Sequence, residues 1–273
     1  MYHILRFPGF KAKAITFSYD DGSINDRRLI KIFNDHGLKG TFNLNSSHFT
    51  NYNDDWVIHE DEALSLYARH EIAVHGKEHL AWTHFPSELT VNDILEDRKY
   101  FERLTGKIIN GMAYPCGGYN DDVVNIARYC GLKYGRTTVS TRNFAIPTDW
   151  LRMPATCHHN DPELFALADK FNSYVAGECA WDGKPYLFYV WGHSHEFARE
   201  NNWDRIEKFA DAVSGKDDVW YATNGEIYDY VQAFKRLVWS VDRSTIYNPT
   251  DTDVFLRLDG QNVLVPSGKT WAR

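Results

Sequence analysis

Short apolar runs alternate with amphipathic stretches along most of the chain. Runs rich in β-branched and aromatic residues predict β-strands, at residues 14–19, 40–44, 71–75, 111–115, 134–139, 186–191 and 219–222. Between them, apolar positions spaced three or four residues apart predict helices, at residues 24–36, 60–70, 86–105, 121–130, 161–176, 202–213 and 226–237. The run YLFYVW at 186–191 lacks polar alternation, which is typical of a strand buried on both faces.

The order of these elements predicts an α/β fold. About seven strand-then-helix units in succession favour a parallel (β/α) barrel over a sandwich or a helical bundle. Beyond residue 238 the pattern changes, because 252–258 and 262–266 have the character of two strands joined by an Asp259-Gly260 turn, with no helix between them. We therefore predict a barrel domain at residues 1–239 and a small β-rich appendage at residues 240–273.

Composition excludes several classes of protein. The 273 residues are 43% hydrophobic and 25% charged, which is ordinary for a globular protein and not for a disordered one. The formal net charge is -7 and no run of Lys and Arg occurs, so neither a nucleic acid nor an anionic membrane is expected as a partner. The cysteines form no CxxC pair, which argues against a disulfide framework or a structural zinc site; they are Cys116, Cys130, Cys157 and Cys179.

Neither a membrane span nor a secretion signal is visible in the sequence. No segment approaches the roughly 20 apolar residues that a membrane-spanning helix needs. The first residues, MYHILRFPGFKAK, show no apolar core of signal-peptide length followed by a small-residue cleavage site. We therefore expect a cytoplasmic protein, or an extracytoplasmic one if a leader has been removed.

Two adjacent carboxylates, Asp20 and Asp21, follow the first predicted barrel strand. In such barrels the functional groups gather at the carboxyl ends of the strands. Two neighbouring carboxylates both stay ionised only where a cation or hydrogen-bond donors compensate their charge. Because adjacent residues of an extended chain point in opposite directions, one can bind a metal while the other has a second role. The structural alternative is an ordinary helix N-terminal turn, in which Asp-Gly is also common.

A pair of histidines, His75 and His79, follows the third predicted strand. The H-x3-H spacing can converge on a metal, either on a helix face or across a strand-to-loop bend. Two histidines and one carboxylate form a catalytic ligand set that leaves positions open for water and substrate. The chain has 12 histidines, so such a pair also arises by chance, but its position after a strand and downstream of Asp20 and Asp21 favours a metal site.

With Tyr19-Asp20-Asp21-Gly22 followed by His75-x3-His79, the chain resembles the polysaccharide deacetylase family, the NodB-homology enzymes related to carbohydrate esterase family 4. The resemblance runs from about residue 11 to about residue 232 and includes Gly40-Thr41-Phe42. It implies a distorted seven-stranded (β/α) barrel of the NodB-homology type, with the catalytic function in residues 1–239. It also implies that Asp20 is the catalytic base and that the metal ligands are Asp21, His75 and His79.

The third motif of that family matches only in part. Its counterpart here is Ala113-Tyr114-Pro115-Cys116-Gly117. The resemblance implies that the backbone N–H of Cys116 stabilises the oxyanion, a role that any residue except proline can fill. Alanine stands at position 113 where the family has an arginine that orients the catalytic aspartate. Arg136 and Arg152 are candidates to replace that arginine.

The last motif of the family is a buried strand that ends in histidine, and Trp191-Gly192-His193-Ser194-His195 follows such a strand here. The resemblance implies that His193 is the general acid, with His195 as a neighbour or a substrate contact. Asp149-Trp150 is a candidate for the family's Asp-Trp motif, which supports the catalytic histidine and lines the cleft. Candidate substrate contacts are therefore Tyr114, Trp150 and His195.

The implied function is a metal-dependent hydrolase that removes acetyl groups from an N- or O-acetylated saccharide. Activated water would attack the acetyl carbon with Asp20 as base and His193 as acid. Zn²⁺ is the expected metal, with Co²⁺, Ni²⁺ and Mn²⁺ as alternatives. Two other functions stay open: a hydrolase of the same fold that acts on a non-sugar amide, and a catalytically weak saccharide-binding protein. The C-terminal tail is also a candidate surface for homo-oligomer formation.

Overall fold

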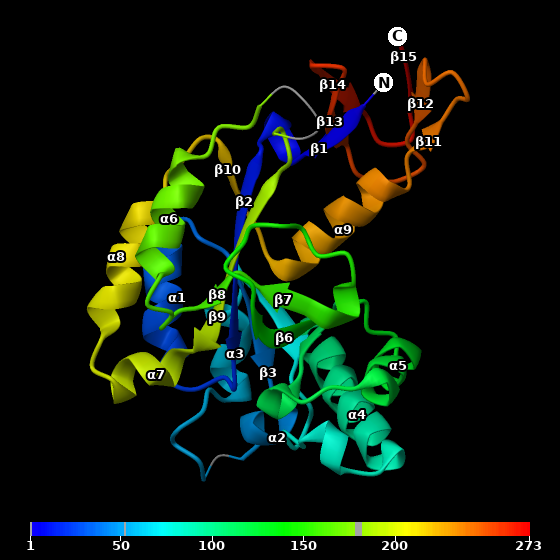
Figure 1. Ribbon diagram of the computed structural model, residues 1–273. Helices are drawn as coiled ribbons and strands as arrows, with labels where there is room; N and C mark the ends of the chain where they lie inside the picture. The colour runs from blue at the N-terminus through cyan, green and yellow to red at the C-terminus, as the bar shows by residue number, and fades with distance from the viewer. Residues whose placement is uncertain (1, 52, 178–181) are drawn as a thin grey trace.

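The computed structural model describes residues 2–51, 53–177 and 182–273. At its centre lies a parallel sheet with the strand order β7-β6-β5-β4-β3-β2-β9-β8, surrounded by helices (Figure 1). The pairs of this sheet are parallel throughout. The predicted α/β class and distorted barrel are therefore confirmed.

The barrel strands are short and largely buried. β2, Lys13–Asp20, is buried at all 8 positions, and β9, Tyr186–His193, is buried except at its two ends. Residues that alternate along these strands face the barrel interior or the outer helices, which explains runs without polar alternation. The other barrel strands are β3 (Gly40–Leu44), β4 (Glu71–Val74), β5 (Gly111–Ala113), β6 (Tyr134–Ser140), β7 (Met153–Ala155) and β8 (Cys157–His158).

The segment 153–158 closes the barrel. Its first part, β7, pairs with β6, and its second part, β8, pairs with β9. Thr156 lies between them and donates its backbone N–H to the carbonyl of Tyr189, at 2.8 Å. Sequence analysis predicts no strand here, because MPATCH contains a proline and shows neither alternation nor a run of β-branched residues.

The strand predicted at 219–222 has a different position from the one expected. β10, Val219–Tyr221, pairs with the first residues of β2, Lys13 to Ile15, whereas β3 pairs with β2 only from Phe17 onward. β10 therefore fills the space beside the start of β2, and the β7–β8 segment completes the barrel instead.

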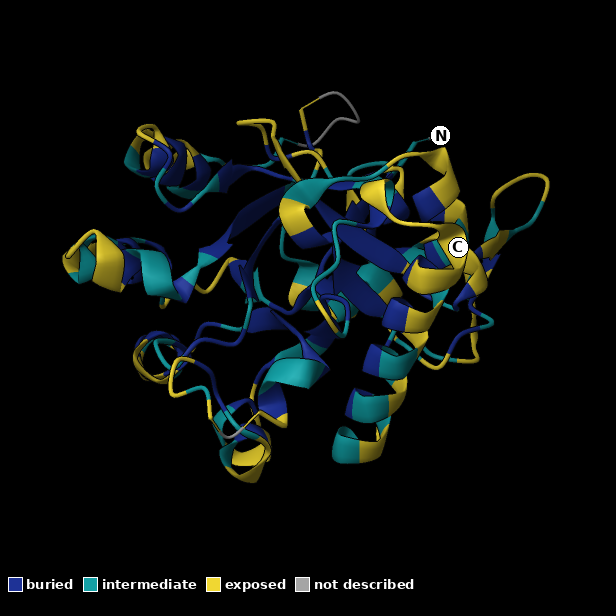
Figure 2. Cartoon of the chain, turned by 90° about the horizontal axis from the view of Figure 1, so that it is seen from below, coloured by how far each residue is buried: buried dark blue, intermediate teal, exposed yellow. Residues whose placement is uncertain are grey.

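Helices surround the barrel, with buried faces toward the strands and exposed faces outward (Figure 2). The ring of Phe17 on β2 packs against Phe33 and Phe209 of two of these helices, at centroid distances of 4.5 and 6.1 Å. The helices are α1 (Asp26–Asp35), α2 (Ser46–Phe49), α3 (Glu60–Leu66), α4 (Ser87–Thr105), α5 (Asp121–Tyr129), α6 (Leu164–Ser173), α7 (Ser194–Arg199), α8 (Trp203–Val213) and α9 (Asn224–Lys235).

Two small antiparallel sheets lie at the end of the barrel where the strands begin (Figure 1). One contains β1 (His3–Arg6), β13 (Val254–Leu258) and β14 (Gln261–Val265), and the other contains β11 (Val238–Trp239), β12 (Thr245–Tyr247) and β15 (Thr270–Ala272). The Asp259-Gly260 turn joins β13 to β14, as expected, with φ values of 47° and 81°. The division of the chain at residue 239 stays a prediction, because β1 pairs with β13 and so joins both ends of the chain in one sheet.

No helix in the described part of the chain has the length and apolar character needed to cross a membrane. Cys116, Cys130 and Cys157 are free thiols. The fourth cysteine, Cys179, lies outside the described residues.

Candidate metal and catalytic centre

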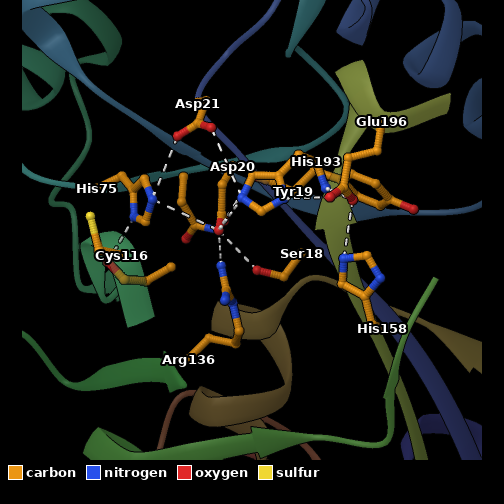
Figure 3. A network of polar contacts seen from close by, with 12 residues as sticks. Ser18, Tyr19, Asp20, Asp21, His75, Cys116, Arg136, His158, His193 and Glu196 are labelled. Carbon is orange, nitrogen blue, oxygen red and sulfur yellow. Dashed lines mark hydrogen bonds and ion pairs between the residues drawn. The ribbon is translucent and has the colours of Figure 1, made fainter. Parts of the chain in front are cut away.

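Side chains from three strand ends meet at the opposite end of the barrel. β2 ends at Asp20 and β9 ends at His193, and these two residues are partners in the parallel pair. His75 follows β4 directly. Because parallel strands end at the same rim, these side chains converge there (Figure 3). Asp21 and His79 have φ values of 76° and 52°, a left-handed conformation that is uncommon outside glycine and often marks functional sites.

Asp21, His75 and His79 form a compact group of potential metal ligands. Oδ1 of Asp21 lies 3.7 Å from Nε2 of His75 and 3.6 Å from Nε2 of His79. Ligand atoms of a tetrahedral zinc site, with bonds of about 2.0–2.1 Å, are separated by about 3.4 Å. A zinc-sized ion therefore fits between these three atoms after a small contraction. The group is one of two among the described residues that could hold a metal ion.

Contacts behind His75 leave its Nε2 atom free to bind a metal. Its Nδ1 lies 2.9 Å from the carbonyl oxygen of Ala113, which can only accept, so Nδ1 carries the proton and Nε2 keeps its lone pair. The backbone N–H of His75 donates to Oδ2 of Asp97 at 3.1 Å, and that of Ser46 donates to Oδ1 at 2.7 Å. Burial raises the pKa of Asp97 to about 7, although these hydrogen bonds oppose the rise.

Asp20 is not needed as a metal ligand and lies beside the metal group. Its side chain is buried, and Oδ1 accepts a hydrogen bond of 2.9 Å from Nδ2 of Asn43. Oδ2 pairs with Nη2 of Arg136 and lies 3.8 Å from Nε2 of His75. Burial by itself would raise the pKa of Asp20, but the charges of Arg136, His75 and His193 outweigh it and hold this pKa well below its ordinary value.

Arg136 occupies the position that the missing arginine at residue 113 leaves open. Ala113 on β5 and Arg136 on β6 are partners in the parallel pair. Alanine at 113 is small, and the guanidinium of Arg136 on the neighbouring strand reaches Asp20. Its Cζ atom lies over the ring of Trp191, 4.4 Å from the centroid. The other candidate, Arg152, instead pairs with Asp149 and Asp121.

His193 lies between Asp20 and a carboxylate that sequence analysis did not identify, Glu196. Nε2 of His193 is 3.8 Å from Oδ2 of Asp20 and 3.9 Å from Oδ2 of Asp21, and Nδ1 is 3.6 Å from Oε1 of Glu196. Burial would lower the pKa of His193, but the nearby carboxylates of Glu196, Asp20 and Asp21 outweigh it and raise this pKa. The ring therefore favours the protonated form that a general acid needs.

A second group of possible ligands comprises His158, His159 and Glu196. Nε2 of each histidine lies 3.1 Å from Oε2 of Glu196. The backbone N–H of Asn160 donates to Nδ1 of His158 at 3.1 Å, so Nδ1 is unprotonated and Nε2 must carry the proton of the neutral ring. Nε2 of His158 therefore presents an N–H toward Glu196 and has no lone pair for a metal.

The remaining candidate residues do not all reach the centre. Sγ of Cys116 lies 3.9 Å from Nδ1 of His79, and Cys116 has a φ of 55°; the role of its N–H stays a prediction. His195 lies at the rim, with its ring centroid 5.3 Å from that of His193 and 5.2 Å from that of Trp56. Tyr114 is buried and donates its hydroxyl to the carbonyl of Leu151 at 2.6 Å.

Asp149 and Trp150 make their contacts with residues other than His193. The ring of Trp150 is buried against Tyr228 of α9, with a centroid distance of 5.3 Å, and the carboxylate of Asp149 lies 2.7 Å from Nη1 of Arg152. The carboxylate beside His193 is Glu196 instead. The available signal was its position three residues after a strand-end histidine, where a helix begins.

Comparison with known proteins agrees with this geometry. Residues 8–135 match the family model described as "Polysaccharide deacetylase". No curated protein matches the sequence. The recognised resemblance is confirmed over residues 8–135: this part of the chain matches the polysaccharide deacetylase family.

Solved structures share the fold at low sequence identity. A Mycobacterium smegmatis protein assigned to the polysaccharide deacetylases is 17% identical, with TM-score 0.60, over 85% of this chain and 94% of that chain. The allantoinase PuuE is 14% identical, with TM-score 0.62, over 82% and 91%. A mutant of a Bacillus anthracis pseudoenzyme of carbohydrate esterase family 4, with restored enzymatic activity, is 18% identical, with TM-score 0.51, over 83% and 70%. This protein spans 61% of the length of a Streptococcus pyogenes deacetylase and 44% of the length of a polysaccharide deacetylase from Bacillus cereus.

Proposed function

We propose that the protein is a metal-dependent hydrolase that removes acetyl groups from an N- or O-acetylated saccharide. The observation that supports this most directly is the arrangement around Oδ2 of Asp20. That atom pairs with Arg136 and lies 3.8 Å from Nε2 of both His75 and His193. A base, a ligand group and an acid are thus adjacent, which is what hydrolysis of an acetyl group requires.

Asp21, His75 and His79 would hold the metal. A divalent ion in such a site lowers the pKa of water toward about 7 and polarises a carbonyl. Asp20, kept ionised by Arg136, would accept the proton of the attacking water. The backbone N–H of Cys116 would donate to the oxyanion, and removal of one such donor typically costs about 10²–10³ in rate.

His193 would complete the reaction as general acid. An amine leaves poorly unless it is protonated, so a proton donor must reach the leaving group. The raised pKa of His193 and the approach of its Nε2 to the carboxylates at the rim are consistent with that role. The proton would pass from Nε2 to the leaving nitrogen or oxygen as the bond to the acetyl carbon breaks.

The test is acetate release from chitin oligosaccharides and acetylated xylan, with and without a chelator. The proposal expects release that the chelator abolishes and added Zn²⁺ restores. Allantoin belongs in the same panel, because an allantoinase shares the fold; its turnover in place of acetate release would assign a non-sugar amide. Metal binding without turnover of any substrate would identify a saccharide-binding protein instead.

A further inference from the structure

We propose that Glu196 is the positioning residue for His193, and that His158 and His159 on the barrel-closing segment hold Glu196 in place for this role. The inference rests on the proposed function, in which His193 donates the proton. Glu196 would act on Nδ1 of His193, so that Nε2 is presented to the reacting atoms above Asp20.

The position of Glu196 follows from the local fold. β9 ends at His193 and α7 begins at the next residue, so Glu196 is the third residue of the helix. A side chain there turns back toward the residue before the helix. Its Oε2 accepts from the backbone N–H of His193 at 3.4 Å, and its Oε1 lies 3.6 Å from Nδ1 of the same residue. Glu196 therefore contacts the backbone of His193 and places a carboxylate oxygen beside its ring.

The other side of Glu196 is held by β8. His158 and His159 approach Oε2 with their Nε2 atoms at 3.1 Å each, and β8 is itself paired with β9. The backbone N–H of Asn160 fixes His158 as a donor on Nε2. Arg199 adds a cation 3.4 Å from Oε1. Glu196 is thus surrounded by donors, while its side chain is only 14% exposed.

The packing of His159 supports a built contact. Its ring is fully buried between Tyr19 and Phe197, at centroid distances of 5.7 and 4.1 Å. The ring also lies directly against Gly192, where an added Cβ would be 2.0 Å from Nδ1 of His159. Glycine at position 192 therefore provides the space for His159 to reach Glu196.

A carboxylate at position 196 can accept hydrogen bonds from both sides, but an amide cannot. Glutamine has one acceptor oxygen, so in Glu196→Gln its NH₂ group must face either His193 or the donors His158 and His159. This replacement retains size and helix geometry but breaks one side of the arrangement. Glu200→Gln, the same change at the end of the same helix, is the matched control, since Glu200 contacts Asn160, Arg199 and Asn202.

The leaving group distinguishes a positioning role from a structural one. A general acid matters for a poor leaving group, such as the sugar amine of chitopentaose, and little for 4-nitrophenolate. With the zinc-loaded protein, we expect Glu196→Gln to lower kcat on chitopentaose by about 10–100-fold, because acid catalysis contributes about 10²–10⁴. On 4-nitrophenyl acetate kcat should fall less than about 3-fold. An equal loss on both substrates would overturn the proposal.

His158 provides a rescue experiment. His158→Met removes the donor to Glu196, whereas the Nε2 of glutamine in His158→Gln can replace it. We expect His158→Met to show the same leaving-group dependence as Glu196→Gln, more weakly, and His158→Gln to recover most of the activity. Recovery in neither variant, or in both, would contradict the assignment.

A readout independent of turnover separates this inference from the proposed function. In protein with ¹⁵N-labelled histidine, the ring nitrogens of His193 report which one carries the proton and whether Nδ1–H is hydrogen-bonded. Glu196→Gln should shift the Nδ1 resonance of His193, and Glu200→Gln should not. If wild type releases no acetate and the shift occurs, the function is wrong and the positioning is right. Unchanged His193 resonances in Glu196→Gln would refute the positioning.

Discussion

Two groups of two histidines and one carboxylate lie on either side of His193 in the described part of the chain: Asp21 with His75 and His79, and Glu196 with His158 and His159. In the first group the carboxylate oxygen is 3.6–3.7 Å from the histidine nitrogens, a separation that suits atoms around a common ion. In the second group the separations are 3.1 Å, shorter than the roughly 3.4 Å between ligand atoms around a zinc ion.

The difference arises at the far nitrogen of each ring. Nδ1 of His75 donates to a carbonyl, so Nε2 has a lone pair to offer. Nδ1 of His158 accepts from a backbone N–H, so Nε2 has a proton to give. The same three residue types are therefore arranged to suit a metal ion in one place and, in our proposal, a proton-donating support in the other. The partner of Nδ1 decides between these roles.

The largest expected effect is loss of the metal from the first group alone. His75→Ala and His79→Ala each remove one of three ligands and should lose stoichiometric metal after dialysis against metal-free buffer. His158→Ala should keep it, because its Nε2 is a donor. Elemental analysis of the three variants against wild type measures this. Metal lost from His158→Ala, or retained in both others, would break the comparison.

The next effect separates the two adjacent carboxylates. Asp20→Asn should retain the metal and the fold but lose about 10²–10⁴ of kcat, because an amide cannot accept the proton of water. Asp21→Asn should weaken metal binding, and excess metal should partly restore its activity. Metal titration and acetate release for both variants provide the test. Equal metal loss in the two, or near-normal turnover in Asp20→Asn, would show that the roles are wrongly assigned.

Arg136 offers a smaller effect with a built-in rescue. Arg136→Met leaves the buried carboxylate of Asp20 without its cation, and breaking a buried ion pair typically costs about 3–5 kcal/mol. We expect a lower Tm and a lower kcat. Adding Ala113→Arg to this variant should restore part of both, since residues 113 and 136 are partners across β5 and β6.

Arg152→Met is the control for this prediction. Arg152 is about one-third exposed and pairs with Asp121 and Asp149 outside the centre. Its removal should change Tm little, because exposed ion pairs contribute about 0–1 kcal/mol. If the double variant Arg136→Met with Ala113→Arg has no higher Tm or kcat than Arg136→Met alone, an arginine at position 113 cannot pair with Asp20.

Local patterns were sufficient to predict most of the barrel and the cluster of Asp21, His75 and His79. β2 and β9 are apolar enough to be recognised as buried strands, and Asp20, Asp21, His75 and His79 follow strand ends, where parallel barrels place their chemistry. The β7–β8 segment was missed because its strand pairing depends on two partners that are distant in the sequence, not on its own composition.

The supporting residues of the site were harder to predict, for the same reason. Arg136 reaches Asp20 only because β6 lies beside β5, a relation that spacing along the chain cannot reveal. Glu196 becomes meaningful only once β8 brings His158 and His159 to it. Asp149 is followed by Trp150, as the Asp-Trp motif expects, but its local turn directs its carboxylate toward Arg152. Tertiary contacts, not motifs, decide which polar residues support the ligands.

The smallest predicted effect concerns the pH dependence of stability. Burial disfavours the charged form of His159 more than the carboxylate of Glu196 favours it. The pKa of His159 is therefore lowered from 6.5 to about 4. Between about pH 4 and pH 6.5 the unfolded state therefore binds more protons than the folded state. His159 therefore contributes stability above pH 6.5 that is lost as pH falls through about 4.

His159→Phe keeps a ring between Tyr19 and Phe197 but removes this titration. The wild-type free energy of unfolding should fall relative to that of the variant by up to about 3 kcal/mol between pH 7 and pH 4, since one pKa unit corresponds to about 1.4 kcal/mol. Urea unfolding at both pH values measures the difference.

The raised pKa values of Asp26 and Asp97, both about 7, act in the opposite direction, but they are common to both proteins and cancel. His84→Phe, the same change at an exposed site, should follow wild type. If His159→Phe also follows wild type from pH 7 to pH 4, His159 is charged in the folded protein, and the second group is then an ion-paired cluster instead of a neutral hydrogen-bonded support.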